Sequence, residues 1–302
     1  MSRETFRRTL KEKGQLALKT QSSKKRESEI LQVAKSPVVT MAATTPIYDA
    51  IQIMTKEGFR RIPIANPGTK VLEGIITATD IIDYLGGGKK FEVIEQRFGG
   101  NFFKAINEPI RLIMVKDVVS VKTSAKISKA IELMKEKNLG GLPVVDDKNS
   151  VKAIITERDV AHIFADRISS IKVSQIMSKN MITALPTTTI FEAEKTMIMQ
   201  GFRRLPIISN GKVVGIITSM DIIRFFGSGK VFKYLQSKTI KQVLNTLALD
   251  IATREVLTIE PQADVGYAAK IMQDKNVGAI PIVQSGKLVG IITERDFFKI
   301  IE

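Results

Sequence analysis

The chain has 302 residues, of which 44% are hydrophobic and 25% charged, and its formal net charge at neutral pH is +15. This length suffices for two ordinary domains, and the charge indicates polyanionic partners such as nucleotide phosphates, nucleic acid or an acidic protein. The absence of cysteine excludes disulfides, and a single histidine, His162, excludes most zinc sites and Ser-His-Asp triads. The sequence has no run apolar enough to span a bilayer and no signal peptide in residues 1–35, so we expect a cytoplasmic protein without membrane association.

The first 35 residues are more basic than the rest of the chain. They contain ten Lys or Arg against four Glu, a net charge of +6. One interpretation is a flexible basic arm, because such a polar segment buries too little apolar surface to fold alone. The alternative is a segment that docks on a partner protein or on nucleic acid.

Four related segments follow the arm, and the third shows their organisation most clearly. Its threonines at 187–189 are suited to cap a helix, Gly201 to end that helix, and Asn210-Gly211 to form a hairpin turn. The expected elements are a strand over 181–184, a helix over 190–200, strands over 205–208 and 213–217, and a second helix over 218–227. The predicted repeat is therefore β-α-β-β-α, an α/β (α+β) unit.

The other copies keep this order, and each has a proline that leads a strand, at Pro63, Pro143, Pro206 and Pro281. The chain also has a longer internal repeat that spans two copies, since GFRRIPI at 58–64 recurs as GFRRLPI at 201–207. One unit of this size buries a small core, so we pair consecutive repeats. The predicted boundaries are an arm over 1–35, a first pair over 36–166 (repeats 36–86 and 112–166, connector 87–111) and a second pair over 167–302 (repeats 173–227 and 250–302, connector 228–249).

The recurring pattern of an apolar-Pro-apolar strand, a turn and G-apolar-apolar-T-x-x-D resembles the CBS motif. Four copies, together with RRIPI, GGGKK and NFFKAINEP, resemble the archaeal four-CBS proteins related to the γ subunit of AMP-activated protein kinase. The resemblance covers about residues 36–302. It implies two CBS pairs, or Bateman modules, packed as a flat disc, with AMP, ADP, ATP, S-adenosylmethionine or a related adenine compound bound in clefts between the repeats of a pair.

The four T-x-x-D segments are the first candidates for ligand binding. The alternative role is a capping box, in which threonine and acid satisfy free amides at a helix start. A capping box favours Glu or Gln in the last position, whereas all four copies have Asp, and a carboxylate can also accept bonds from two ribose hydroxyls. The resemblance implies that Asp holds ribose and that Thr helps at ribose or phosphate. The pairs are Thr77 with Asp80, Thr156 with Asp159, Thr218 with Asp221, and Thr293 with Asp296.

Two arginine pairs precede the proline-led strand in the odd-numbered copies, at Arg60-Arg61 and Arg203-Arg204. The alternative role is a solvated charge. The planar guanidinium fork suits a phosphate, and the resemblance implies that basic residues at these positions contact one.

The even-numbered copies depart from this pattern, because Gly140 and Gly278 stand in place of the first arginine. Arg158 and Arg295, inside the two ITERD segments, are candidates to supply the missing charge, and the alternative is a surface charge in the first turn of a helix. Ala153 replaces a glycine that the other three copies keep, which puts the backbone approach of a ligand to the second copy in question.

Adenine is expected against the first strand of each copy, where backbone groups would read the base edges. The alternative is that a threonine there simply favours a strand. The residues concerned are Thr40, Ser120, Thr183 and Thr258.

Catalytic and metal sites are not indicated by the sequence. GSGKVF at 227–232 lacks the glycine spacing and the Ser or Thr of a Walker loop, and His162 has no catalytic constellation around it. We therefore expect a non-catalytic regulatory sensor of AMP, ADP or ATP without a redox or metal cofactor. The alternatives are an S-adenosylmethionine sensor or a nucleic-acid-binding protein that uses the basic arm; a regulated partner protein and a homodimer are left open.

Overall fold

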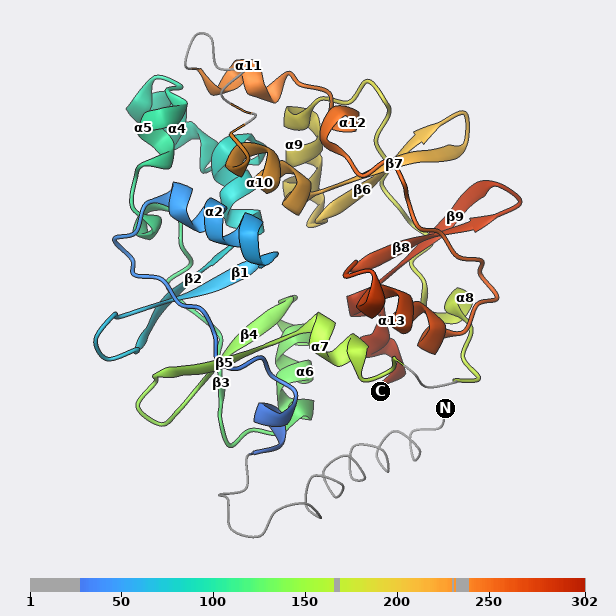
Figure 1. Cartoon of the computed structure of the whole chain (residues 1–302), viewed down its shortest axis with the longest axis horizontal. Coiled ribbons are helices and arrows are strands. Elements are labelled where there is room, and N and C mark those ends of the chain that lie inside the picture. The colour runs from blue at the N-terminus through green and yellow to red at the C-terminus, as the bar shows by residue number, and fades with distance from the viewer. Residues whose placement is uncertain (1–27, 166–168, 230, 232–238, 302) are drawn as a thin grey trace. The chain divides into compact units, whose positions relative to one another are not determined.

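The computed structural model describes residues 28–165, 169–229, 231 and 239–301, which form two compact units (Figure 1). The even unit combines repeats two and four and comprises the described residues of Met1–Val38, Val119–Met181 and Leu257–Glu302. The odd unit combines repeats one and three and comprises Val39–Val118 and the described residues of Ile182–Val256. Consecutive repeats lie in different units. Their predicted pairing, and their packing as a disc, therefore stay predictions.

Repeat three follows the predicted element order closely. It contains α9 (Ile190–Gln200), the antiparallel strands β6 (Arg204–Ser209) and β7 (Lys212–Thr218), and α10 (Ser219–Gly227). The Thr189 side chain accepts the Glu192 amide at the start of α9, and Gly201 ends it with φ of 69°. Asn210 and Gly211 both have positive φ, at 49° and 77°, as a two-residue hairpin turn requires. These local predictions are confirmed.

The other repeats have the same helix-hairpin-helix order, and the mixed content confirms the α+β class. Repeat one has α2 (Ile47–Glu57), β1 (Arg61–Ala65), β2 (Leu72–Thr77) and α3 (Ala78–Ile82), continued by the π-helix η2 (Asp83–Gly87). Repeat two has β3 (Val121–Lys122), α6 (Ile127–Glu136), β4 (Gly141–Val145), β5 (Val151–Thr156) and α7 (Glu157–His162). Repeat four has α13 (Val265–Asp274), β8 (Ala279–Gln284), β9 (Lys287–Thr293) and the 3-10 helix η5 (Glu294–Ile300).

Short helices fill the segments before and between the repeats. They are η1 (Glu29–Gln32), α4 (Phe91–Phe98), α5 (Phe102–Ile106), η3 (Ile110–Leu112), α8 (Val173–Ile176), α11 (Ile240–Leu244) and α12 (Ala248–Ile251).

The first strand of each repeat is much shorter than the sequence predicts. Repeat two has the two-residue strand β3, parallel to β4. In the other repeats one residue forms an isolated parallel bridge, Met41 with Ile64, Ala184 with Ile207 and Ile259 with Ile282. The predicted strand over 181–184 is therefore wrong except at Ala184. This contact is parallel and non-local. The length of the strand therefore depends on its distant partner and cannot be predicted from the sequence of the segment alone.

Each hairpin is completed by a segment that leads into a different repeat, which we call the lead-in. Lys35, which leads into repeat one, exchanges two main-chain hydrogen bonds with Ile154 of repeat two, at 2.8 and 3.1 Å. Val115, which leads into repeat two, does the same with Ile75 of repeat one. The remaining antiparallel bridges are Ser178 with Ile291 and Thr253 with Ile216.

This exchange corrects the arm predicted over residues 1–35. Residues 28–35 fold onto repeat two, and Ile30 is fully buried in its core. The rest of the predicted arm, residues 1–27, lies outside the described residues. The glycine that Ala153 replaces serves the lead-in: a Cβ at Gly74 would lie 3.0 Å from the Val115 carbonyl oxygen, and one at Gly290 3.2 Å from that of Ser178. Ala153 itself is fully buried beside Lys35, so this position is a packing site.

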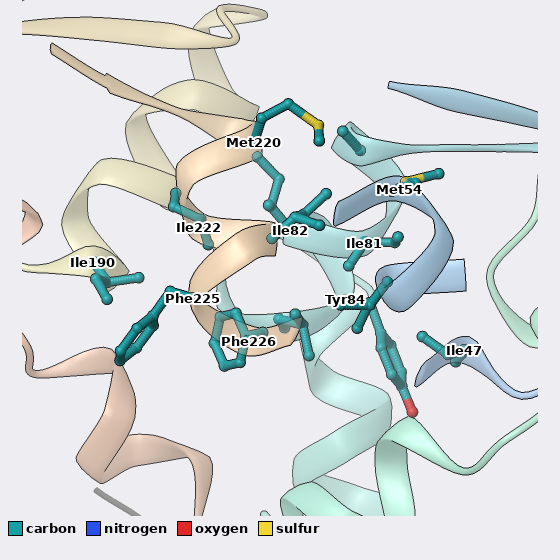
Figure 2. Packing of buried hydrophobic residues seen from close by; sticks show 14 of the residues in the cluster. Ile47, Met54, Ile81, Ile82, Tyr84, Ile190, Met220, Ile222, Phe225 and Phe226 are labelled. Carbon is teal, nitrogen blue, oxygen red and sulfur yellow. The ribbon is translucent and has the colours of Figure 1, made fainter. Parts of the chain in front are cut away.

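The core of the odd unit is shared by repeats one and three. Figure 2 shows Met220 and Phe226 of α10 in one buried cluster with Ile81, Ile82 and Tyr84 of repeat one, while Phe225 lies toward Ile190 of α9. The Phe226 ring stacks on Phe102 of α5 with centroids 5.6 Å apart. The Tyr84 hydroxyl, buried in this core, donates to the Ala105 carbonyl oxygen at 3.1 Å. Neither repeat therefore buries its apolar helix faces alone.

In the even unit, repeats two and four are joined by two reciprocal ion pairs, which we call the clasp. Arg158 Nε donates to Glu294 Oε1 at 2.7 Å, and its Nη1 donates to Asn276 Oδ1 at 2.6 Å. Arg295 Nε donates to Glu157 Oε1. Both glutamates are only 1% exposed, so each needs the arginine of the other repeat to offset the loss of solvation. The corresponding positions of the odd unit carry no charge.

We predict that Arg158→Ala lowers the free energy of unfolding by about 3 kcal/mol, because Glu294 is left buried without its cation. Arg158→Met with Glu294→Met removes both charges and should recover most of this loss. The control is Lys129→Ala, which breaks an exposed pair with Glu132 and should change stability far less than Arg158→Ala does. Urea unfolding measures all three variants. Equal stabilities of the Arg158 and Lys129 variants would show that the clasp does not stabilise the unit.

Candidate functional site

The four Thr and Asp pairs have the same geometry, at the junction between a return strand and the following helix. In repeat three, Asp221 Oδ2 accepts from the Thr218 amide at 2.8 Å and from its hydroxyl at 2.6 Å. The same two bonds measure 2.9 and 2.6 Å at Asp80, 2.8 and 2.7 Å at Asp159, and 2.7 and 2.8 Å at Asp296. Each threonine oxygen also faces the amide of its aspartate, so all four pairs are complete capping boxes.

The expectation that aspartate argues against a capping box is wrong. The threonine before each helix is extended, with φ between −136° and −121°. In this conformation its amide points at the last residue of the box, and the short aspartate reaches it. The capping bonds use only Oδ2, however, so Oδ1 of each aspartate is left for another partner. The assignment of these residues to ribose stays a prediction.

A cation occupies Oδ1 in three of the four copies. Lys90 Nζ donates to Asp80 at 2.7 Å, Arg224 Nη1 to Asp221 at 2.6 Å, and Lys299 Nζ to Asp296 at 2.8 Å. Ser178 Oγ also donates to Asp296 Oδ1, at 3.2 Å. These side chains form a basic rim beside each carboxylate, where they can contact an anion.

Repeat two differs, since the described residues give Asp159 Oδ1 no hydrogen bond. Burial raises the pKa of this carboxyl above its ordinary value, and the bonds from Thr156 oppose that rise. His162 takes the place of Arg224 and Lys299, three residues after the aspartate. Its Nε2 is buried without a partner among the described residues, and burial lowers its pKa, as does the nearby Arg158 charge. Asp159 is therefore the carboxylate with the most capacity to accept bonds from a ligand.

The sequence reasoning missed the three basic rim residues. Arg224 and Lys299 follow their aspartates by three positions, which places them on the same helix face one turn on. A search for T-x-x-D followed by x-x-Arg or x-x-Lys would have found them. Lys90 comes instead from the GGGKK segment ten residues after Asp80, and only the fold brings it back.

The structure places each arginine pair directly beside the Thr and Asp of its own repeat. Arg61 is paired with Thr77 across β1 and β2, and Arg204 with Thr218 across β6 and β7. The Arg60 carbonyl oxygen accepts the Ala78 amide at 2.8 Å, and that of Arg203 accepts the Ser219 amide at 2.9 Å. All four arginines are half-buried. The predicted ribose and phosphate residues of the odd repeats are thus neighbours.

In the even repeats, the same backbone positions are Gly140 and Gly278, which accept the amides of Glu157 and Glu294. Arg158 and Arg295 lie in the clasp, so the alternative that they are simple surface charges is wrong. A contact of either arginine with phosphate stays a prediction, and it would have to coexist with the glutamate bond or replace it.

The predicted adenine residues each stand immediately before the bridge residue of the first strand. Thr40 and Ser120 are half-buried, whereas Thr183 and Thr258 are exposed. In repeat one, the Met41 amide next to Thr40 donates to the Pro63 carbonyl oxygen at 3.2 Å. This backbone contact explains the positions of the four residues in the fold, and their role toward adenine stays a prediction.

Two cavities in the described part of the chain lie away from these residues. One of about 540 Å³ in the odd unit is lined by Gly86–Gly88 and by the α9 residues Phe191, Lys195 and Met199. Another, of about 370 Å³, lies between α6 and the end of η5 in the even unit. The described residues hold no cluster of three or more His, Asp or Glu with metal-site geometry. In the same described part of the chain, every helix is too short or too polar to cross a bilayer.

Comparison with known proteins gives a consistent result. The CBS domain family model matches residues 29–87, 110–166, 173–228 and 248–302. The protein MJ1225 of Methanocaldococcus jannaschii is 38% identical over 273 residues, which is 89% of this chain and 98% of the relative. A 33.4 kDa protein encoded in a ribosomal RNA operon of Thermofilum pendens is 31% identical over 260 residues, or 86% of each chain.

Solved structures support the fold over nearly the whole chain. The crystal structure of MJ1225, described as a proposed archaeal homologue of γ-AMPK, matches with a TM-score of 0.86 at 37% identity, over 90% of this chain and 99% of that one. A Pyrococcus horikoshii protein matches in fold at 21% identity, with a TM-score of 0.57 over 89% and 96% of the two chains. With four family matches placed on the four repeats, this chain belongs to the CBS-domain family.

Proposed function

We propose that this chain is a non-catalytic cytoplasmic sensor that binds AMP, ADP or ATP at the Thr and Asp boxes of its repeats. The observation that carries the proposal is the strand pairing in repeats one and three, where an arginine pair lies across the strand end from each Thr and Asp box. A nucleoside phosphate needs both groups, an acceptor for its ribose hydroxyls and a cation for its phosphate.

The family and the described fold support the regulatory part of the proposal. CBS pairs typically bind adenine nucleotides or S-adenosylmethionine in regulatory roles, and MJ1225 is described as a proposed γ-AMPK homologue. Ligand binding would shift the chain between states by the difference in its affinity for them, and so signal to a regulated partner.

The four boxes are not equivalent in this proposal. Repeat two offers the freest carboxylate oxygen, at Asp159, but has Gly140 in place of an arginine. Repeats one and three offer the arginine pairs, but Lys90 and Arg224 occupy the carboxylate and must turn toward the phosphate when ribose binds. We therefore expect sites of different affinity for mono- and triphosphates.

The first test is thermal unfolding with AMP, ADP, ATP and S-adenosylmethionine. A ligand at one hundred times its Kd should stabilise the chain by about 2.7 kcal/mol. Thermal stabilisation by S-adenosylmethionine alone would identify the protein as an S-adenosylmethionine sensor and not a nucleotide sensor. Unchanged unfolding with all four compounds would contradict an adenine-ligand sensor.

The second test is Asp159→Asn. Asparagine keeps one oxygen for the Thr156 amide but replaces the free oxygen by an NH₂ group, which cannot accept from a ribose hydroxyl. We expect the Kd of the site in repeat two to rise tenfold to about a hundredfold, since a bond to a charged acceptor contributes about 1.5–3 kcal/mol. Calorimetric titration measures the Kd, and Glu136→Gln, an exposed charge loss on α6, is the control. If Asp159→Asn left all nucleotide affinities unchanged, repeat two would not be a nucleotide-binding site.

The third test concerns phosphate. Arg203→Ala and Arg204→Ala should weaken ATP and ADP more than AMP and leave adenosine unchanged, with at least one variant losing about tenfold or more for ATP. Lys212→Ala, an exposed cation on the same hairpin, is the control and should change none of these values. Equal losses for adenosine and ATP would mean that the arginines act on the fold and not on phosphate.

A further inference from the structure

One buried carboxyl of the odd unit plays no part in the proposed nucleotide site. Glu194 lies in α9 and is fully buried, and neither of its carboxyl oxygens has a hydrogen-bond partner in the described part of the chain. The fifth residue of the corresponding helix is apolar in the other repeats, at Ile51, Ile131 and Ala269, and each of these is also buried. Repeat three therefore places an acid where the fold elsewhere takes a hydrophobic side chain.

The carboxyl is held at a close contact between repeats three and one. A Cβ at Gly86 would lie 2.5 Å from Glu194 Oε2, and one at Gly87 would lie 2.9 Å from the Glu194 carbonyl oxygen. The Gly86 position also faces Leu244 of α11. The mirrored contact, where Gly227 of repeat three meets Ile51 and Thr55 of α2, has no acid. The glycines let α9 approach closely, and the packed carboxyl is shielded from bulk solvent.

The charged groups around α9 do not compensate Glu194. Asp80 is paired with Lys90, Asp221 with Arg224, and Lys241 with Glu95. Burial raises the pKa of the Glu194 carboxyl well above its ordinary value, and burial is its only cause. The titratable and charged groups on the packed elements are Asp80 (α3), Asp83 and Tyr84 (η2), Arg204 (β6), Asp221 and Arg224 (α10) and Lys241 (α11).

We propose that Glu194 makes the contact between α9 and Gly86–Gly88 dependent on a proton. With the carboxyl neutral, α9 stays packed on the glycine segment. An ionised carboxylate without a partner requires water, so its ionisation separates α9 from this segment and opens the shared core of the odd unit. Since α9 ends at Gly201, two residues before Arg203, loss of the same proton would also loosen the segment that leads into the arginine pair. This proton dependence does not require a bound nucleotide.

The direction of the pH effect follows from proton counting. Above the ordinary glutamate pKa of about 4.3 the unfolded chain releases this proton, while the folded chain keeps it. Stability from this group is therefore fully present below that pH and is lost as the pH rises toward the folded pKa. The unfolding equilibrium constant should gain up to tenfold per pH unit within this window.

The experiment compares unfolding of the full chain from pH 4.5 to 9, without nucleotide, for wild type, Glu194→Ile and Glu194→Gln. Isoleucine copies repeats one and two, and glutamine keeps the shape without titrating. Both variants should lack the tenfold-per-unit component of the wild type, and Glu194→Ile should be more stable at pH 8. Glu136→Gln, which removes an exposed glutamate, should keep the wild-type slope.

Hydrogen exchange locates the effect. After correction for the intrinsic pH dependence, amides of 190–200 should exchange faster at pH 8 than at pH 5 in the wild type, and equally at both in Glu194→Ile. The proposal would be overturned if the free energy of unfolding depended on pH equally in the wild type and in Glu194→Gln. It would also be overturned if the corrected amide exchange rates of α9 in the wild type were the same at pH 5 and pH 8. Because no readout includes a nucleotide, these outcomes are separate from the tests of the sensor function.

Discussion

The hydrogen bond that a threonine amide donates to the aspartate carboxylate three residues later is the interaction on which each repeat depends. It fixes the turn from the return strand into the second helix, and it does so at the end of the hairpin where the arginine pair or its glycine counterpart begins. The start of the helix, the position of the second carboxylate oxygen and the backbone of the neighbouring arginine or glycine are therefore set together. A change at the aspartate affects both the fold and the candidate site, which is why an isosteric amide separates the two better than alanine does.

Local signals made part of this structure predictable. Thr189, Gly201 and the Asn210-Gly211 turn each act within a few residues of the bonds they form, and the helix over 190–200 was placed correctly from them. The first strand was not, because its only bonds are to a strand of the same repeat more than twenty residues on. Lys90 and the clasp were also missed: Arg158 and Glu294 are 136 residues apart, and neither segment shows in its own sequence that it will meet the other.

The two units differ in the side chains that join their two repeats. In the odd unit, aromatic and aliphatic side chains of α10 and repeat one fill the shared core, and one acid is accepted within it. In the even unit, the residues after the capping threonine are charged, and two arginines satisfy two buried glutamates across the contact. Apolar packing tolerates small shifts, whereas paired buried charges require one geometry. The charged contact thus belongs to the even unit, and the arginine pairs belong to the odd unit.

The exchange of lead-in segments has a consequence for how such a chain can arise. The lead-in of a repeat completes the hairpin of another repeat. A single repeat duplicated together with its own lead-in would therefore have no segment to complete its own hairpin. Two consecutive repeats supply each other's edge segments, since residues 28–165 contain both hairpins and both of their edge segments, and 169–301 contain the other two. The smallest piece that a gene duplication could add without an open sheet edge is therefore a double repeat. The return of GFRRIPI as GFRRLPI, half a chain later, fits such an ancestry.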